Sequence, residues 1–489
     1  MKLRNFIAPV FIAAVSMITS AQEPWLHIYY QSPSKFKQAD MNQVLDISFD
    51  EEAGTMTINS DGDSEAIGLG DIDRFVIGPN VCRIDIETDM KTYDSTFGYK
   101  YEGMPVTDVV SKTVYLDGNL HFDGRGIYED VDFRVKIRGR GNSTWGYSKK
   151  PYRLKFSEKQ KLGPIHKAKN LVLLANYIDG SLMKNFAAFA FGQLINMPYI
   201  NRSLPVDVYL NGYYKGSYHL TEQVGINNGS VDLSKEDEPN SILFELDTNS
   251  PDEDEYPFTE STYGVPTRIK DPDAPEDPDE LEEWVDKWHD EIDDFFYIVS
   301  NGRPSEMYAA CNLETLVRYV MVFDMACNQE LNHPKSVFLH KTSDQPWEFG
   351  PCWDFDWAYG YSPTYTKGNS GDGWWWGGPT YPSYENPLIG FGNSANQGGN
   401  KFFYSLCNNS VFLNKFKEVW DDFYKNKQAE FWRMFDEYAE SLEPSATLQG
   451  AKMGSKYQSW RSEVETLRQW IKNRFEYINS DKNYGLWED

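Results

Sequence analysis

Cysteine is scarce in this sequence of 489 residues, which contains only five. Their number is odd and no two are spaced as Cys-x-x-Cys, so neither a disulfide framework nor a zinc site is supported. We therefore predict that most of them are small buried residues, as free cysteines usually are. The five are Cys82, Cys311, Cys327, Cys352 and Cys407.

Positive charge is also in short supply. The sequence has 47 Lys and Arg against 74 Asp and Glu, which gives a formal net charge of −27. A chain this acidic is not drawn to nucleic acid or to an anionic membrane by bulk electrostatic attraction. We predict no nucleic-acid partner, although a local basic pocket for phosphate stays compatible with the composition.

Long apolar runs are absent after the first residues, so we predict no transmembrane helix. Residues 1–21 have the pattern of a signal peptide: Lys2 and Arg4 precede the apolar stretch Phe6–Ile18, and small residues follow up to Ala21. We expect the mature protein to be exported, which means a periplasmic, cell-surface or extracellular location.

The remaining sequence predicts an α+β protein. Residues 22–80 contain short alternating runs separated by Asp, Gly and Ser turns, which predicts a small accessory β module. Strand patterns continue to about residue 230, with hairpin turns expected at 116–119 and at Asn211–Gly212. Apolar residues at helical spacing dominate from about residue 275, for example over 281–299 and 313–327.

A glycine-rich turn lies between two of the predicted strands. Glycines let backbone N–H groups approach an anion closely, and several Lys and Arg residues surround this turn in an otherwise acidic chain. The turn therefore predicts phosphate binding, and the alternative is a tight turn with solvated basic residues. The candidate residues are Arg138, Gly139, Gly141, Asn142, Ser143 and Lys155.

Two carboxylates stand two positions apart in the segment 351–360. On a strand, Asp354 and Asp356 would share a face, and the aromatic residues between and around them would raise the cost of ionising both. A hard cation such as Mg²⁺ would relieve that cost. The segment predicts a metal site, and the alternative is a loop with solvated aspartates and core aromatics.

The predicted helix 313–327 ends in a polar segment, 328–336, and two predicted short strands, 337–340 and 347–350, connect that segment to residues 351–360. Pro334 stops the helix. We expect this arrangement to bring Glu330, Asn332 and Lys335 into the neighbourhood of the two aspartates.

Residues 361–400 are rich in Gly, Asn, Trp and Tyr and include Trp374, Trp375 and Trp376. We predict a long loop with exposed aromatic side chains, the usual composition of a lid or a binding surface. Exposed aromatic rings suit sugar rings, nucleobases and peptides equally, and a glycan contact through the three tryptophans is one expectation.

Four separated motifs together resemble the CotH kinase family of spore coat proteins, over about residues 130–480. They are Arg138-Gly139-x-Gly141-Asn142-Ser143-Thr144-Trp145, Lys149-x-Pro151-Tyr152-Arg153-Leu154-Lys155-Phe156, Asn211-Gly212-Tyr213-Tyr214-x-Gly216-x-Tyr218-x-Leu220-x-Glu222 and Trp353-Asp354-Phe355-Asp356-Trp357. The resemblance implies a reduced, two-lobe protein-kinase-like core within residues 81–489, with a helical C-terminal part. It also implies phosphorylation of Ser or Thr in secreted or surface proteins, with ATP and Mg²⁺ or Mn²⁺, or Ca²⁺ as a further choice.

By this resemblance, Lys155 matches the lysine that meets the nucleotide phosphates, Asp354 matches the metal-binding aspartate, and Glu222 matches a motif glutamate of the nucleotide site. The chain departs from the family where many relatives carry an aspartate before the strand; it has the segment 330–336 instead. Glu330 is the candidate substitute for that catalytic base, and Asn332 is a candidate metal ligand together with Asp354 and Asp356.

Two other functions stay open from the sequence. One is an inactive kinase-like scaffold that binds glycan or protein through residues 361–400, since a fold does not determine a function. The other is a glycoside hydrolase with Asp354 and Asp356 as its acid pair, but the surrounding lysine and glycine signals fit phosphate better than sugar.

Overall fold

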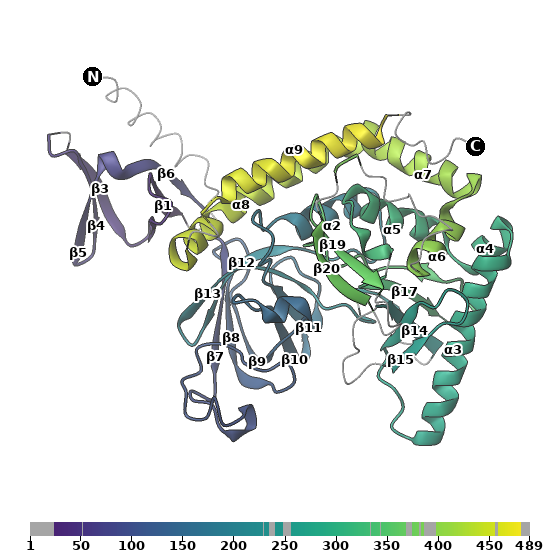
Figure 1. Ribbon diagram of the computed structural model, residues 1–489. Coiled ribbons are helices and arrows are strands. Elements are labelled where there is room, and N and C mark those ends of the chain that lie inside the picture. The colour runs from purple at the N-terminus through teal and green to yellow at the C-terminus, as the bar shows by residue number, and fades with distance from the viewer. Residues whose placement is uncertain are drawn as a thin grey trace. The chain divides into compact units, whose positions relative to one another are not determined.

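The computed structural model describes residues 24–480 apart from 51, 228, 234–239, 248–255, 333, 343, 368–373, 381–382, 386–397 and 455–457. The chain forms two compact units (Figure 1). The first, here called the barrel unit, comprises Met1–Leu182, Ser203–Thr221 and Glu437–Glu463. The second unit comprises Met183–Arg202, Glu222–Asp436 and Val464–Asp489.

The barrel unit is built on a closed barrel of strands in the order β10-β11-β13-β12-β7-β8-β9. Their bounds are β7 (Cys82–Thr88), β8 (Leu116–Asp123), β9 (Val131–Gly139), β10 (Tyr152–Gln160), β11 (Ala168–Leu174), β12 (Leu204–Leu210) and β13 (Tyr213–Glu222). The parallel pair β12 and β7 closes the barrel between segments that are far apart in the sequence. Closure pairs the strand edges that an open sheet would leave exposed.

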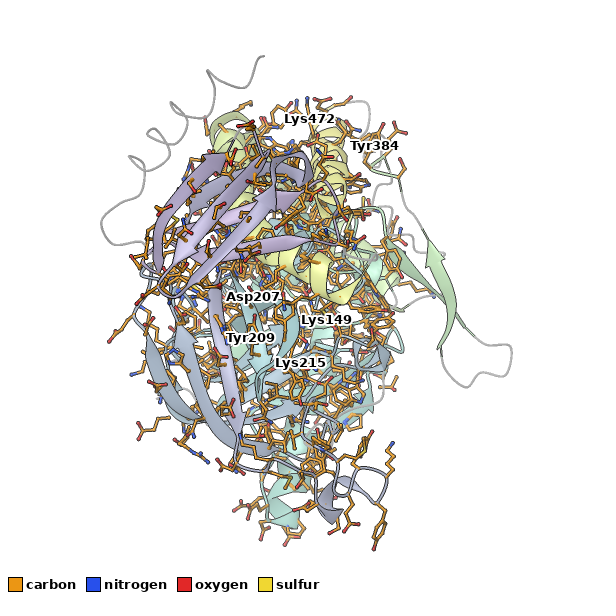
Figure 2. The ribbon with its side chains drawn as sticks, turned by 90° about the vertical axis from the view of Figure 1, so that its left-hand side faces the viewer. Lys149, Asp207, Tyr209, Lys215, Tyr384 and Lys472 are labelled. Atoms are coloured by element: carbon orange, nitrogen blue, oxygen red, sulfur yellow. The ribbon has the colours of Figure 1, made fainter. Side chains whose placement is uncertain are left out.

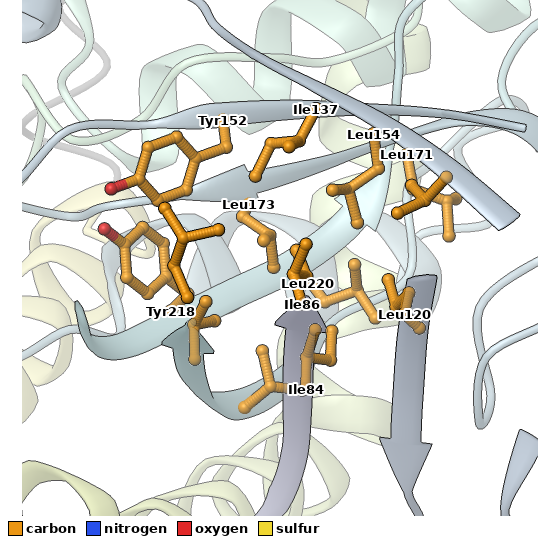
Figure 3. Close-up of a cluster of buried hydrophobic side chains, with 14 of the residues drawn as sticks. Ile84, Ile86, Leu120, Ile137, Tyr152, Leu154, Leu171, Leu173, Tyr218 and Leu220 are labelled. Carbon is orange, nitrogen blue, oxygen red and sulfur yellow. The ribbon is translucent and has the colours of Figure 1, made fainter. Parts of the chain in front are cut away.

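Branched aliphatic and aromatic side chains fill the barrel interior, and Figure 3 shows part of this cluster. Alternate residues of β8 point inward and are buried, as the period of a strand requires. The rings of Tyr152 and Tyr218 stack with centroids 5.5 Å apart, and both phenol groups are hydrogen-bonded, to Asp108 and to the backbone of Lys150. This packed interior makes the barrel a structural core.

A small β module precedes the barrel. Its strands are β1 (Trp25–Tyr30), β2 (Phe36–Asp40), β3 (Val44–Asp50), β4 (Thr55–Ser60), β5 (Asp63–Gly68) and β6 (Ile72–Gly78). They form two three-stranded sheets, β2-β1-β6 and β3-β4-β5, around a separate cluster of buried apolar side chains. The strands end at Gly78; the proposed module boundary at residue 80 stays a prediction.

Part of helix α8 (Gln428–Met453) packs on the outside of β12 and β13 through polar contacts. Ser445 donates a hydrogen bond of 2.6 Å to Asp207, and the side chain of Gln449 accepts one of 2.9 Å from the backbone N–H of Ser217. Ser445 and Gln449 are four residues apart and so lie on one face of the helix. Figure 2 labels Asp207, which this contact buries.

The second unit combines an antiparallel sheet, in the order β15-β16-β14-β17-β18, with most of the helices. The strands are β14 (Ser241–Leu246), β15 (Tyr256–Thr259), β16 (Pro266–Asp271), β17 (Val337–Thr342) and β18 (Glu348–Phe349). The helices are α2 (Lys184–Leu194), α3 (Pro278–Asn301), α4 (Pro304–Ala310), α5 (Leu313–Met325), α6 (Gly398–Cys407) and α7 (Ser410–Asp422). A π-helical turn, Phe423–Lys427, joins α7 to α8, and α9 (Trp460–Ile478) follows.

Helix α5 is the central helix of this unit. Asn312 caps its N-terminus by accepting hydrogen bonds from the N–H groups of Glu314 and Thr315, and nearly every residue after that first turn is buried. The helix packs against α2 and α7. A helix that is apolar all round is a buried core helix, and the segment that follows α5 therefore starts from the interior of this unit.

The predicted α+β class is confirmed, as are the helices at 281–299 and 313–327 and the hairpin at Asn211–Gly212. The five cysteines are buried and free, as predicted. The β-rich part is a closed barrel, and the two-lobe kinase-like core stays a prediction. No helix in the described ranges is long and apolar enough to cross a membrane; the predicted signal peptide, 1–21, lies outside the described residues.

Two expectations about local structure were wrong. The hairpin turn expected at 116–119 is part of strand β8, where a Cβ on Gly118 would stand 2.5 Å from the carbonyl oxygen of Glu87. The glycine therefore permits a close approach of two strands and does not turn the chain. The loop expected over 361–400 contains two paired strands, β19 (Ser362–Lys367) and β20 (Trp374–Thr380), before α6 begins.

Candidate functional site

The segment 351–360 follows strand β18 as irregular chain. The expectation that Asp354 and Asp356 share the face of a strand was therefore wrong. Asp354 has a φ of +66°, a left-handed conformation that costs free energy for a residue other than glycine. The two carboxyl groups nevertheless lie close enough for Asp354 to raise the pKa of Asp356.

Three polar side chains hold this segment in place. Asn185 of α2 accepts a hydrogen bond of 2.9 Å from the backbone N–H of Phe355. Lys184, also on α2, donates to the backbone oxygen of Asp356 at 3.2 Å. Asn328 donates to the backbone oxygen of Asp354 at 3.0 Å, so the strained residue is tied to the segment that follows α5.

The segment after α5 folds into a 3₁₀ turn, Gln329–Leu331. Asn328 caps this turn by accepting a hydrogen bond of 2.9 Å from the N–H of Glu330. The backbone N–H of Lys335 donates a hydrogen bond of 2.9 Å to the carbonyl oxygen of Glu330. Asn328 therefore links segments 328–336 and 351–360, which were predicted to lie close together.

Glu330, Lys335, Asp354, Asp356 and Trp357 form one group, here called the carboxylate cluster. The ammonium of Lys335 lies 3.6 Å from a carboxylate oxygen of Glu330 and 4.0 Å from the centre of the Trp357 ring. Glu330, Lys335 and Asp356 are buried, and Asp354 is partly exposed. The predicted neighbourhood of these residues is present.

Burial dominates the electrostatics of the cluster. It raises the pKa of Glu330 well above its usual range, with further increases from Asp354 and Asp356 and an opposing effect from Lys335. Burial likewise raises the pKa of Asp356, and so do the charge of Asp354 and the hydrogen bond to it. Carboxyl groups in this situation need either protons or a cation to neutralise them.

Both carboxylate oxygens of Glu330 are buried and make no hydrogen bond. A buried polar group without a hydrogen bond is costly, and an ionised one is far more so. The oxygens of Asp354, Asp356 and Glu330 are the ligand type that Mg²⁺ and Mn²⁺ prefer. These residues therefore fit a divalent cation chemically.

No group of three or more His, Cys, Asp or Glu side chains within the described ranges stands in a metal-binding arrangement. This result is consistent with the usual Mg²⁺ site at a phosphate ligand, which uses one or two carboxylates and takes its remaining oxygens from water and from the phosphates.

The structure does not bring Asn332 into this group of interactions. Its side-chain oxygen accepts a hydrogen bond of 3.1 Å from Asn400 of α6, and its backbone oxygen accepts another of 2.9 Å from the N–H of the same residue. Asn332 thus connects the 3₁₀ turn to α6. Its role as a metal ligand stays a prediction.

The glycine-rich turn lies in the barrel unit, between β9 and β10. A Cβ on Gly139 would stand 2.1 Å from the Trp145 ring, and Gly141 has a φ of +81°. Asn142 and Ser143 begin the 3₁₀ turn Ser143–Gly146. Both glycines are thus required by packing and backbone conformation, and a phosphate-binding role for the turn stays a prediction.

Arg138 and Lys155 lie on neighbouring strands of the barrel. The guanidinium of Arg138 donates to the backbone oxygen of Lys112 and lies 5.2 Å from the centre of the Tyr115 ring. Lys155 is exposed on the outer face of β10, between the buried residues Leu154 and Phe156. Lys155 belongs to the barrel unit and the carboxylate cluster to the second unit.

Lys149 is a buried lysine of the barrel unit whose position was not predicted. Its ammonium donates to the backbone oxygens of Ala175 and Ser217 (Figure 2 labels the residue).

Glu222, proposed for the nucleotide site, is fully buried and accepts a hydrogen bond of 2.9 Å from the N–H of Arg202. No sequence signal marks Lys149 as buried, whereas Asn328 stands directly before the turn Gln329–Leu331, and asparagine is a preferred residue at such an N-cap position.

The side chains of Trp374, Trp375 and Trp376 lie outside the described residues, so the glycan contact stays a prediction.

Residues 137–478 match the family described as CotH kinase protein, in agreement with the resemblance read from the motifs. None of the curated proteins compared with the chain matches it. The matched range includes the carboxylate cluster and omits the β1–β6 module.

Proposed function

Because the chain belongs to the CotH kinase protein family, we propose that it is a metal-dependent phosphotransferase which moves the γ-phosphoryl group of ATP to a Ser or Thr hydroxyl of an exported protein. The observation that carries this proposal is the carboxylate cluster, in which the buried Glu330 and Asp356 lie beside Asp354 and both oxygens of Glu330 lack a hydrogen bond; burial, with the charge of Asp354, raises the pKa of Glu330 and of Asp356. Phosphoryl transfer depends mainly on positioning and on neutralising charge, and carboxylate oxygens are the ligand type that a hard cation prefers.

In this proposal, Asp354 and Asp356 hold Mg²⁺ or Mn²⁺. The cation, when bound, would offset the negative charge of the transferring phosphate. Asn185, Lys184 and Asn328 fix the backbone that carries the two aspartates. Pre-organised ligands of this kind lose little freedom when the cation and nucleotide bind.

Glu330 takes the role of the catalytic base. Its carboxylate accepts the proton of the acceptor hydroxyl while the hydroxyl oxygen forms a bond to the γ-phosphorus. The bond from that phosphorus to the bridging oxygen breaks, and ADP leaves with the electron pair. The absence of hydrogen bonds to either Glu330 oxygen supports this role, because an accepting lone pair is not already occupied.

Lys155 and Glu222 are proposed to serve the nucleotide, as the family resemblance implies, together with Arg138 and the turn 139–143. The exposure of Lys155 supports its part, since a dissolved ligand can reach the side chain. Export of the protein is also part of the proposal and rests on the pattern of residues 1–21.

The test is calorimetric titration of the protein with ATP in the presence of Mg²⁺ or Mn²⁺. We expect metal-dependent binding by the wild type, loss of that binding in Asp354→Asn, and clear weakening in Lys155→Ala. Asp344→Asn is a control, because it makes the same change of a carboxylate to an amide at an exposed residue outside the carboxylate cluster. No binding by the wild type at millimolar ATP would refute the proposal; titration with glycans and replacement of Trp374–Trp376 would then test the scaffold alternative.

A further inference from the structure

Lys335 is the cation that lies within the carboxylate cluster itself. Its side chain is 7% exposed, and its ammonium stands 3.6 Å from Glu330, close enough for an ion pair but too far for a normal hydrogen bond. The same ammonium lies 4.0 Å from the centre of the Trp357 ring, a cation–π contact. The cluster therefore already contains a positive group aimed at its acidic side chains.

The charge of Lys335 acts on two of the carboxyl groups at once. It opposes the rise in pKa of both Glu330 and Asp356. An ammonium whose field reaches both groups is close to where a cation and its phosphate ligands would have to bind. The lysine ammonium is a compact charge on a flexible stem. Small rotations of that stem let it reach a phosphate oxygen.

The backbone on both sides of Lys335 is fixed. Its own N–H donates to the carbonyl oxygen of Glu330, and the next residue, Ser336, has a φ of +51°. The N–H of Ser336 points to a carboxylate oxygen of Asp247 at 3.4 Å, and the other oxygen of Asp247 pairs with Arg268 at 3.2 Å. A chain of buried charged groups thus holds the strained turn that presents Lys335.

We infer that Lys335 contacts the terminal phosphates of the nucleotide and is a phosphate-binding lysine located in the second unit. The inference rests on the proposed function, because it needs a phosphate ligand at the cluster. An ammonium forms charge-assisted hydrogen bonds with phosphate oxygens, and such bonds are stronger than a 3.6 Å ion pair, so we expect the ligand to compete with Glu330 for the ammonium.

The chain contains a well-matched control lysine. Lys341 of β17 forms an ion pair with Glu291 and lies 5.6 Å from the centre of the Trp347 ring. It therefore repeats the glutamate and tryptophan contacts of Lys335, but its partners are not among the residues of the carboxylate cluster. Replacing either lysine removes one charge and one cation–π contact.

The experiment compares Lys335→Gln with Lys341→Gln, using calorimetric titration with Mn²⁺ plus ATP and, separately, with Mn²⁺ alone. We expect Lys335→Gln to bind Mn²⁺ plus ATP roughly tenfold to hundredfold more weakly, the loss that one charge-assisted hydrogen bond produces. Binding of Mn²⁺ alone should be unchanged or tighter, since a competing cation is gone. Lys341→Gln should bind as the wild type does, and Lys335→Arg should recover part of the affinity.

Two results separate this inference from the proposed function. Suppose that Asp354→Asn no longer binds ATP while the affinity of Lys335→Gln for ATP stays within a factor of about two of the wild-type value. The inference is then wrong and the proposed function survives. If the wild type itself does not bind Mn²⁺ plus ATP, both are wrong. Lys335→Met keeps the apolar stem against Trp357 and removes only the ammonium, so it provides a second variant if the glutamine variant is unstable.

Discussion

Asp207 is a buried carboxyl group of β12 outside the candidate site. Burial raises its pKa to about 6, although Tyr214 and Ser445 donate hydrogen bonds to it and lower the pKa. A carboxyl group whose pKa is raised on folding keeps its proton longer in the folded protein. Its contribution to stability is therefore largest below about pH 4 and decreases as the pH rises through about 6.

We expect Asp207→Asn to be more stable than the wild type at pH 7.5, by about 1–3 kcal/mol, because the amide oxygen keeps both hydrogen bonds without the cost of a buried charge. The difference should shrink toward zero near pH 4. Urea denaturation of both proteins at the two pH values measures this. A variant that is equally destabilised at both pH values would show that the two donors hold Asp207 ionised in the wild type.

At the scale of elements, the first turn of α6 closely approaches the 3₁₀ turn that carries Glu330. A Cβ on Gly399 would stand 2.3 Å from the carbonyl oxygen of Leu331 and 2.9 Å from that of Asn332. Alanine in a helix normally stabilises it relative to glycine by up to about 1 kcal/mol. We expect the opposite for Gly399→Ala, a loss of about 1–3 kcal/mol, because backbone atoms must move apart.

Thermal denaturation and Mn²⁺ binding of Gly399→Ala measure the effect on α6 and on the Glu330 turn. Gly70→Ala is the matched control, since no atom lies within 4 Å of a Cβ at that glycine. A stabilised Gly399→Ala variant with unchanged Mn²⁺ binding would contradict the close contact of the two elements.

Elements governed by local patterns were the ones that the sequence predicted well. The helix α5 and the turn at Asn211–Gly212 follow from apolar spacing and from residues that favour positive φ. The parallel pairing of β12 with β7 does not follow from any local pattern, because the two strands are far apart in the sequence. Barrel closure was accordingly missed, as was the passage of β8 through Gly118.

The same distinction applies to the candidate site. The meeting of Glu330, Lys335 and the two aspartates could be predicted, since a helix end and a short strand pair connect them in sequence. The positive φ of Asp354 could not be predicted from the sequence. The neighbouring Phe355 is held by a hydrogen bond to Asn185, which lies 170 residues earlier in the chain. Likewise, the contact of Asn332 with Asn400 depends on where α6 packs.

At the scale of the whole molecule, the net charge of −27 opposes the approach of an anionic nucleotide. Salt screens charges that are farther apart than the Debye length, about 10 Å at 0.1 M, but has much less effect on buried pairs in contact. The long-range repulsion should therefore weaken with salt, while the contact of a buried lysine such as Lys335 with phosphate should change little.

We expect the association rate of Mn²⁺ plus ATP to rise a few-fold between about 20 and 200 mM NaCl, with an affinity that rises or stays level. This is the reverse of the behaviour of a site in a basic surface patch, where salt lowers both quantities. Stopped-flow measurement with a fluorescent ATP analogue at several salt concentrations tests it, with neutral adenosine as a control ligand that should show no such rise. A steep loss of affinity with salt would mean that exposed cations, Lys155 among them, dominate nucleotide binding over the buried cluster.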